Sequence, residues 1–504
     1  MALVPLARVP ALQGARRGPD NWALRYGDAV LTWGELETLS NRRAHALRDA
    51  GVGAGDLVTL AVPNGVAYYE WMFALWKLGA QPHVVSWRLP AHELEAIVAV
   101  ARPRRIVAAE PELIARCDAL PEDFGRDHPD ARALPLVLSN PWKAMSSGGS
   151  TGRPKIIVAP LPAAFDDSVP YLLRQPGEGV ILSTGPLYHN MPMLAGMRAL
   201  FAGLQVVGMV RFDPAECLRL IEQHRVAWTY FVPTMMMRIM RLPEAERTRH
   251  DLSGLRTVWH WGAAMPPALK EAWHAWLGAE RIWELYGGTE GIGTTIINGR
   301  DWEARRGSVG QPVQDTLQIR DDAGTPLPAG SIGEIWARPA GGPGSTYRYL
   351  GAEARVAADG YETLGDFGWL DADGYLYIAD RRTDMIVSGG ANIFPAEVEG
   401  ELMAHPGIEG AVVIGLPDDD LGAAAHAIVQ RDRAWAEALT RAQLVEFLAG
   451  RLSRYKIPRT FEFTDQPVRD EAGKVRRAAL RADRVAALEQ GRWRPDAGSA
   501  PPAD

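Results

Sequence analysis

A ten-residue stretch from Ser146 to Lys155 combines three glycines, four hydroxyl residues and two cations. Glycine lets the backbone approach a ligand closely and turn its N–H groups toward one point. The hydroxyl groups add short hydrogen-bond donors, while Arg153 and Lys155 add positive charge. This composition is suited to holding a polyphosphate. It differs from the P-loop of nucleotide triphosphatases, because no Gly-Lys-Ser/Thr follows the glycines at the required spacing.

The same residues also match Gly-x-Ser-x-Gly, the nucleophile elbow of hydrolases, with Ser150 as the nucleophile. An elbow needs a helix directly after the serine. Here Pro154 disfavours helical backbone at Arg153, and the apolar run Ile156–Val158 is typical of a strand. A third interpretation is a solvated Gly/Ser linker. A serine hydrolase therefore stays the alternative from a different class, and the rest of the chain must separate a phosphate loop from a linker.

Size and composition favour a soluble globular protein of about two or three domains. The chain has 504 residues, of which 47% are hydrophobic, and a formal net charge of −7. This charge argues against general binding of nucleic acid or anionic membranes. The sequence shows no uninterrupted apolar run of membrane-span length and no signal-peptide pattern in Met1–Arg17. Cys117 and Cys217 are expected to be free thiols, so we expect a cytoplasmic protein.

Strands alternating with amphipathic helices down to about residue 290 predict an α/β architecture with mainly parallel sheets. Thr32 and Glu35 form a capping-box pattern, and the helix that they open is expected to stop at Gly51. A strand over Leu57–Val62 and a helix around Trp71–Leu78 should follow.

After about residue 307 the pattern changes to short strands and tight turns, which predicts a β-barrel-like part. Asp321–Gly324 and Asp371–Gly374 are the expected hairpin turns. A compact α+β portion then begins near Asp384. It should contain a helix opened by Pro395, a strand, a second helix and finally a disordered tail, over 411–415, 441–452 and 490–504. We predict a large N-terminal domain of several subdomains over 1–382 and a small mobile C-terminal domain over 383–489.

Four further motifs follow the glycine-rich loop in order: Tyr286–Glu290, Leu364–Asp366, Asp380–Gly390 and Gly473–Lys474. Together with the loop they resemble the acyl-adenylate-forming (AMP-binding) superfamily, which includes acyl-CoA synthetases, adenylation domains and luciferases. The resemblance spans roughly residues 20 to 485. It implies an AMP-forming acid–CoA ligase that uses ATP, Mg²⁺ and CoA and proceeds through an acyl-adenylate.

The chemistry of that reaction explains why such residues are needed. A carboxylate must attack the α-phosphate of ATP, so the repulsion between two anions has to be cancelled by fixed cations and N–H donors. By resemblance, Thr289 would donate to phosphate and Glu290 would hold Mg²⁺. Asp366 would accept hydrogen bonds from the ribose, assisted by Arg381. The predicted phosphate contacts in the loop are Ser147, Gly149, Ser150, Thr151, Gly152 and Lys155.

The resemblance also assigns the C-terminal residues. Lys474 would reach the substrate carboxylate and the α-phosphate during adenylation. Thr383 would be the hinge about which the C-terminal domain rotates for the second half-reaction, at a position where the family usually has Asp or Lys. Ser388, Gly389 and Gly390 would then line the tunnel for the pantetheine of CoA. The basic cluster 454–456 either meets the CoA phosphates or is a solvated face.

The segment after His260 departs from the family pattern, because Trp261 stands where a small residue is expected. Its indole should either stack beside the nucleotide or narrow the acyl pocket. This raises the alternative of an enzyme that only thioesterifies preformed acyl-adenylates. The resemblance places the adenine among Gly262, Ala263, Tyr286 and Gly287. It places the acid among His189, Trp228, Tyr230, Thr234, Met235, Trp261 and Gly288.

These pocket residues predict a hydrophobic and bulky carboxylic acid, although a methionine stripe is also typical of plain core and His189 is equally compatible with a structural role. The stretch Val84–Pro90 resembles synthetases that act on polycyclic acids of bile-acid type. A carrier protein acting in trans would be the other acceptor, because the chain contains no carrier domain. The protein is also expected to be a possible homodimer. A further alternative function is that of a non-catalytic relative, which binds nucleotide without turnover.

Overall fold

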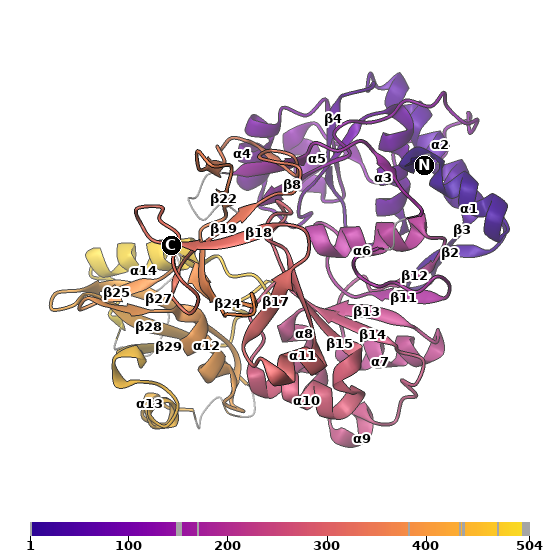
Figure 1. The fold of residues 1–504 in the computed structure, drawn as a ribbon. Coiled ribbons are helices and arrows are strands. Elements are labelled where there is room, and N and C mark those ends of the chain that lie inside the picture. The colour runs from indigo at the N-terminus through magenta and orange to yellow at the C-terminus, as the bar shows by residue number, and fades with distance from the viewer. Residues whose placement is uncertain are drawn as a thin grey trace.

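The computed structural model describes residues 3–147, 154–168, 171–381, 384–432, 435, 439–470 and 473–495. Figure 1 shows a large N-terminal part and, at one side of it, a smaller C-terminal part. The predicted α/β class is confirmed. Within the described ranges, no helix is both long and apolar enough to cross a membrane.

The smaller of the two large sheets carries the glycine-rich loop. In the part of the chain that the structure describes it has seven strands, in the order β20-β9-β8-β5-β4-β6-β7. Strands β8, β5, β4, β6 and β7 are parallel, whereas β9 and β20 add to one edge as antiparallel strands. Their bounds are β4 (Leu57–Ala61), β5 (Gln81–Val84), β6 (Arg105–Ala108), β7 (Leu120–Pro121), β8 (Lys143–Ser147), β9 (Lys155–Ala159) and β20 (Arg348–Leu350).

The larger sheet has a parallel centre and a long antiparallel extension. The centre has the order β2-β12-β11-β13-β14-β15. These strands are β2 (Trp22–Tyr26), β11 (Val180–Ser183), β12 (Gln205–Gly208), β13 (Trp228–Phe231), β14 (Thr257–His260) and β15 (Ile282–Tyr286), with β3 (Ala29–Thr32) antiparallel at the edge.

The extension corresponds to the region predicted as barrel-like, but its described strands continue the larger sheet and do not close into a barrel. The predicted turn Asp371–Gly374 joins two of its strands, as expected. The other predicted turn, Asp321–Gly324, forms at the start of a longer connection. The strands are β16 (Thr295–Asn298), β17 (Ser308–Pro312), β18 (Thr316–Arg320), β19 (Gly333–Arg338), β21 (Arg355–Val356), β22 (Glu362–Thr363), β23 (Asp366–Leu370) and β24 (Leu376–Arg381).

Two helices lie between these sheets. α3 (Val66–Leu78) contacts β5 of one sheet and both β2 and β3 of the other. Every residue from Tyr68 to Leu78 is buried, as expected for a helix with a sheet on each side. α6 (Asn190–Phe201) packs on β11 and β12, and its first residue reaches β8 through a side-chain hydrogen bond between Asn190 and Lys143. Asn190 therefore links the layer between the sheets to the strand that leads into the glycine-rich loop.

The remaining helices cover the outer faces or the ends of the sheets. α4 and α5 pack on the smaller sheet and α10 on the larger one. The predicted capping box opens α2, because Thr32 Oγ1 accepts from Glu35 N and Glu35 Oε2 accepts from Thr32 N. The bounds are α1 (Val9–Arg17), α2 (Trp33–Asp49), α4 (Ala91–Ala101), α5 (Pro111–Cys117), α7 (Pro214–Gln223), α8 (Pro233–Met240), α9 (Glu244–Arg247), α10 (Pro267–Leu277) and α11 (Gly299–Ala304).

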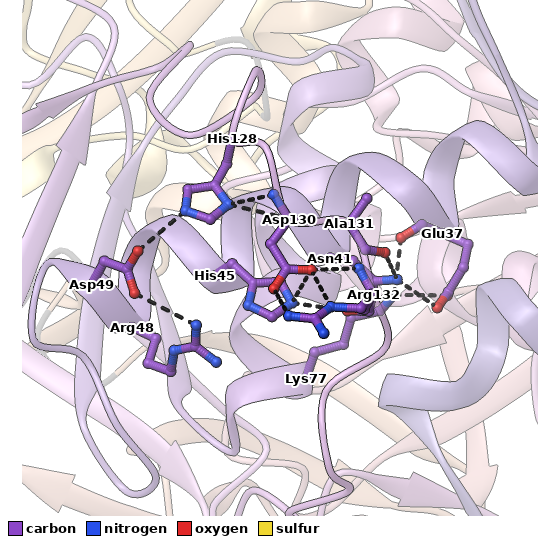
Figure 2. Close-up of polar contacts among 10 residues, drawn as sticks. All are labelled: Glu37, Asn41, His45, Arg48, Asp49, Lys77, His128, Asp130, Ala131 and Arg132. Carbon is purple, nitrogen blue, oxygen red and sulfur yellow. Dashed lines mark hydrogen bonds and ion pairs between the residues drawn. The ribbon is translucent and has the colours of Figure 1, made fainter.

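The chain between β7 and β8 has little regular structure and is fixed to α2 by polar contacts (Figure 2). His45 Nε2 lies 2.9 Å from the Arg132 carbonyl oxygen, and His128 Nε2 lies 3.1 Å from Asp49 Oδ2. The two imidazole rings stack with their centroids 5.8 Å apart. These contacts hold the segment that leads into β8 and hence into the glycine-rich loop.

The C-terminal part has its own three-stranded sheet and its own buried apolar clusters. Its helix begins at Pro395, as predicted. Trp493 is buried against His426, so the prediction of a disordered tail from residue 490 is wrong for 490–495. The elements are β25 (Ile386–Ser388), β26 (Ala391–Ile393), α12 (Pro395–Met403), β27 (Ile408–Asp418), β28 (Gly422–Arg431), α13 (Arg441–Ala449), β29 (Thr460–Thr464) and α14 (Arg477–Glu489).

Candidate active site

The glycine-rich loop connects β8 to β9, which are antiparallel and pair Ser147 with Lys155. Four of the residues predicted to contact phosphate, Gly149, Ser150, Thr151 and Gly152, lie outside the described residues, and so does the side chain of Ser147. The element after the loop is a strand. A nucleophile elbow requires a helix there, so the geometry opposes the serine hydrolase interpretation.

Lys155 and Glu290, which lie far apart in the sequence, meet at the base of this loop. Lys155 Nζ lies 3.3 Å from Glu290 Oε1 and 3.2 Å from the Tyr349 hydroxyl, which itself donates to Glu290 Oε1 at 2.7 Å. Glu290 is 7% exposed. Burial, and then the Glu290 carboxylate, raise the pKa of Tyr349, so its hydroxyl stays a donor. Sequence reasoning missed Tyr349, because it lies on β20 outside every motif.

Tyr286 and Asp366 form the second contact of the site. The Tyr286 hydroxyl donates to Asp366 Oδ2 at 2.6 Å, and the carboxylate is buried. Asp366 begins β23, where it pairs with Arg381 of β24 in antiparallel register. The predicted ribose pair therefore shares one backbone register, while the side chain of Arg381 lies outside the described residues. The ends of β15 and β23 thus bring two sequence motifs together.

The loop after β15 is tightly packed where it passes Leu364, two residues before Asp366. A Cβ on Gly288 would lie 2.6 Å from Leu364 Cδ1 and 2.8 Å from Glu290 Oε2. A Cβ on Gly287 would lie 3.0 Å from Thr294 Oγ1. Thr289 sits in this loop next to Glu290. A side chain on Gly288 would therefore have to move the end of Leu364 and the Glu290 carboxylate.

The C-terminal part enters the site through the turn that carries Lys474. Asp470 Oδ1 accepts from Lys474 N at 2.8 Å, and Asp470 Oδ2 lies 3.8 Å from His189 Nε2. Burial, and then the nearby Lys474 ammonium, hold the pKa of His189 well below its usual value. A Cβ on Gly473 would lie 3.6 Å from Thr234 Oγ1, so this glycine packs on α8. The structure therefore brings the turn that ends at Lys474 against His189 and Thr234, while Lys474 itself is exposed.

Trp261 packs against Tyr230 in the aromatic wall of the predicted acid pocket. The two rings are stacked with centroids 4.7 Å apart and planes 20° apart. Trp261 is 4% exposed, and its Nε1 has no hydrogen-bond partner within the described ranges. The other edge of Tyr230 faces Gly185, where an added Cβ would also meet Pro192 of α6. The indole thus lies beside residues of the layer between the sheets.

The remaining predicted pocket and adenine residues are buried core or turn positions. Trp228 is fully buried and its Nε1 donates to the Leu173 carbonyl at 2.8 Å, so its polar atom is used within the core. Met235 is also buried in the main apolar cluster. Gly262, with φ +87°, turns the chain after β14 and is followed by Ala263, which is partly exposed.

Ser388, Gly389 and Gly390 are not brought to these residues. They form the tip of the β25–β26 hairpin, where Gly389 N donates to the Leu421 carbonyl of the C-terminal sheet. Figure 1 shows β25 at the end of the C-terminal part that points away from the N-terminal sheets. Thr383, the predicted hinge, lies outside the described residues.

The donor set around Glu290 fits a hard cation that keeps substrate oxygens among its ligands. In the described ranges, no group of three or more His, Cys, Asp and Glu side chains is placed to form a metal cage. A magnesium ion, however, is typically bound by one or two carboxylates together with phosphate oxygens. The buried carboxylate of Glu290, next to the phosphate loop, supplies that type of ligand.

Comparison with known proteins supports one family. The sequence profile described as AMP-binding enzyme matches residues 12–350, and the profile of its C-terminal domain matches residues 397–474. A feruloyl-CoA synthase from an Amycolatopsis species is 34% identical over 485 residues, which cover 93% of this chain and 96% of the relative. A fatty acid–[acyl-carrier-protein] ligase from Streptomyces coeruleorubidus is 30% identical, with coverages of 93% and 94%.

Solved structures show the same fold. The o-succinylbenzoate CoA synthetase from Bacillus subtilis, in complex with its acyl-adenylate, superposes with a TM-score of 0.81 at 24% identity and covers 95% of this chain and 98% of its own.

Proposed function

The chain belongs to the AMP-binding enzyme family and is an AMP-forming acid–CoA ligase that uses ATP, Mg²⁺ and CoA; we propose that its acid is hydrophobic and bulky. The observation that supports the ligase function best is the packing of the turn that carries Lys474 on the N-terminal part, where Asp470 Oδ2 lies 3.8 Å from His189 Nε2. We propose that this turn brings the Lys474 cation to the acid pocket. Adenylation needs such a charge between two anions.

In the proposed first half-reaction, the carboxylate of the acid attacks the α-phosphate and pyrophosphate leaves. Lys474 lies between the two anions and neutralises the charge that builds up on the α-phosphate. Lys155 and the hydroxyl residues of the loop, with Thr289, hold the β- and γ-phosphates. Asp366 accepts from the ribose hydroxyls while Tyr286 holds its other oxygen in place. Magnesium, held by Glu290, would supply further charge neutralisation at the phosphates.

His189 serves as a neutral wall of the acid pocket. Because burial and Lys474 keep its pKa low, His189 stays uncharged and does not compete with Lys474 for the carboxylate. Asp470 holds the turn that carries Lys474, because its carboxylate accepts a hydrogen bond from the Lys474 backbone N–H. The catalytic roles of Lys474, Glu290, Thr289 and His189 are thus proposed from position and charge.

The nature of the acid follows from the aromatic wall. Trp261 and Tyr230 stack on each other and make this wall aromatic, and flat or polycyclic apolar groups would pack well against an aromatic wall. The Nε1 of Trp261, which has no hydrogen-bond partner among the described residues, would add one hydrogen-bond donor to the pocket. The bulk of the indole limits the pocket in one direction, which favours rigid acids over long flexible chains.

In the proposed second half-reaction, the C-terminal domain rotates about Thr383 and the CoA thiol attacks the acyl-adenylate, with AMP as the leaving group. The exposed hairpin carrying Ser388, Gly389 and Gly390 is the surface that would line the CoA path after the rotation. Its present position away from the site agrees with a conformation suited to the first half-reaction.

One relative is a ligase for an acyl-carrier protein. Transfer to a carrier protein in trans is therefore the second candidate function. We also propose a cytoplasmic location and a homodimer.

The test is an incubation with ATP, Mg²⁺ and a panel of aliphatic, aromatic and polycyclic acids, with either CoA or a carrier protein as the acceptor. Mass spectrometry should detect acyl-CoA that forms only when ATP is present. Thioester formed only from supplied acyl-adenylate would contradict the first half-reaction. Product on the carrier protein alone would reassign the acceptor.

A further inference from the structure

Three lysines are buried in the described part of the chain, and one of them differs from the others. Lys77 contacts the Glu37 carboxylate at 2.6 Å, and Lys270 contacts Glu284 at 2.5 Å. Lys143 is just as deeply buried, at 5% exposed, but no carboxylate lies within ion-pair distance of it among the described residues. Buried charges in proteins are normally paired, so Lys143 needs a separate explanation.

The surroundings of Lys143 add positive charge. Its Nζ donates to Asn190 Oδ1 and lies 4.9 Å from the ring centroid of Trp142. Arg198, two turns further along α6 than Asn190, also has no carboxylate partner among the described residues, and its buried Nε lacks a hydrogen-bond partner. Burial, and then Arg198, lower the pKa of Lys143 to about 7. The two cations therefore disfavour each other unless an anion joins them.

The position of Lys143 relates this cluster to the acid pocket. Lys143 begins β8 and Ser147 ends it, so four residue steps of about 3.3 Å place the lysine roughly 13 Å below the phosphate loop. Lys143 and Met145 lie on the same face of the strand, toward the layer between the sheets that also holds α6. Asn190, its partner, directly follows His189, which lies beside Lys474. The amine thus lies on the inner face of β8, roughly 13 Å from the phosphate loop and against the first residue of α6.

We propose that Lys143, supported by Arg198, binds a second oxyanion at the far end of the acid substrate, such as a distal carboxylate or a phenolate. This inference rests on the proposed function and narrows it from hydrophobic acids to hydrophobic acids with an anionic group opposite the reacting carboxylate. Asn190 holds the amine in place in the free protein. When the acid binds, the amine becomes a cation and donates a hydrogen bond to the distal oxyanion. Such a charge-assisted hydrogen bond is stronger than the bond to the neutral Asn190 amide.

The test compares dicarboxylic acids of increasing length with monocarboxylic acids of the same length, and 4-carboxycinnamate with 4-methylcinnamate. We expect wild-type kcat/KM to favour one length of diacid by about tenfold or more over its monoacid. The variant Lys143→Met should lose this preference and keep its activity on monoacids. The matched control Lys77→Met removes an equally buried lysine outside the pocket and should keep the preference. An equal loss on both kinds of acid in Lys143→Met, or no preference in the wild type, would overturn the proposal.

A binding measurement separates this proposal from the ligase function. Calorimetry with the preferred diacid, in two buffers of different ionisation enthalpy near pH 8, should show proton uptake in the wild type and none in Lys143→Met. If no acyl-CoA forms from any acid but proton-coupled binding is present, the site stands and the ligase function fails. If acyl-CoA forms and binding of the diacid takes up no proton, the ligase function stands and the site is wrong. Equal binding of inorganic phosphate would show a general anion site and overturn the substrate role.

Discussion

Arg476 Nη1 forms an ion pair with Glu93 Oε1 at 2.6 Å, across the boundary between the C-terminal part and α4. Arg476 is two residues after Lys474, so this contact fixes the exit of the turn that places the lysine beside His189. The arginine is 67% exposed and the glutamate 31%, which makes the pair a surface contact with a modest free energy. Its effect should appear in the half-reaction that needs Lys474 in place.

Breaking this pair should therefore slow adenylation selectively. We expect Glu93→Ala to lower the rate of acyl-adenylate formation by up to about fivefold, because exposed pairs contribute roughly 1 kcal/mol or less. The rate of thioester formation from supplied acyl-adenylate should stay unchanged. The double exchange Glu93→Arg with Arg476→Glu should restore part of the rate. No rescue, or an equal effect on both half-reactions, would argue against a positioning role.

Removal of the Lys474 ammonium should separate the two half-reactions much more strongly. Lys474→Ala should lower acyl-adenylate formation by at least about a hundredfold, because the charge acts between two anions at the reacting centre. Conversion of supplied acyl-adenylate to acyl-CoA should be largely retained. Arg481→Ala, which removes an exposed cation from α14 of the same C-terminal part, is the matched control and should affect neither step. Equal losses in both steps would refute the role given to Lys474.

Trp261 should limit the size of the acid. We expect Trp261→Ala to raise kcat/KM for bulkier acids relative to small ones, since the indole is buried against Tyr230 in the pocket wall. The same change should lower the free energy of unfolding by about 3–5 kcal/mol. Trp273→Ala, at a buried site against Phe231, should cost similar stability without changing acid preference. An unchanged preference in Trp261→Ala would remove the indole from the pocket.

The buried histidine of β5 should make the protein less stable in mild acid. Burial lowers the pKa of His83 to about 3, while its nitrogens contact Thr59 Oγ1 and Ser146 Oγ, both at 2.9 Å. Below pH 6.5, near the pKa of a histidine in the unfolded chain, the unfolded chain binds a proton that the folded protein does not. The free energy of unfolding therefore decreases as the pH is lowered. His83→Asn should reduce the loss in unfolding free energy between pH 7.5 and pH 5.5 by about 1 kcal/mol. Urea titrations at both pH values would measure it, and an unchanged pH dependence would contradict the assignment.

Local patterns in the sequence predicted the elements well where one signal dominates. The capping box at Thr32 and Glu35 opened α2, and the Asp371–Gly374 turn joined two strands, because these contacts are formed within a few residues. The extension of the larger sheet was not predictable in the same way. Which edge a short strand joins depends on long-range packing that no local pattern records.

The candidate site likewise has residues that local motifs predict and residues that only the folded structure reveals. The motifs named Glu290, Asp366 and Lys474, but not the groups that hold them. Tyr349 and Asp470 lie outside or beside the motif residues, and their roles depend on distances that only the fold creates. Likewise, the sequence left two positions open for Trp261, and only the fold shows that its indole stacks on Tyr230.

The contact between Lys155 and Glu290 has a consequence for the order in which the nucleotide and its metal arrive. In the free protein each charge already neutralises the other, so the pair offers little net attraction to ATP alone or to a magnesium ion alone. Bare ATP would have to displace the lysine from a carboxylate that repels phosphate, and a bare cation would meet the ammonium. When the magnesium–ATP complex binds, the ion pair between Lys155 and Glu290 would be replaced by two others, lysine with phosphate and glutamate with magnesium. The enzyme is therefore expected to admit the complex in preference to its separate components.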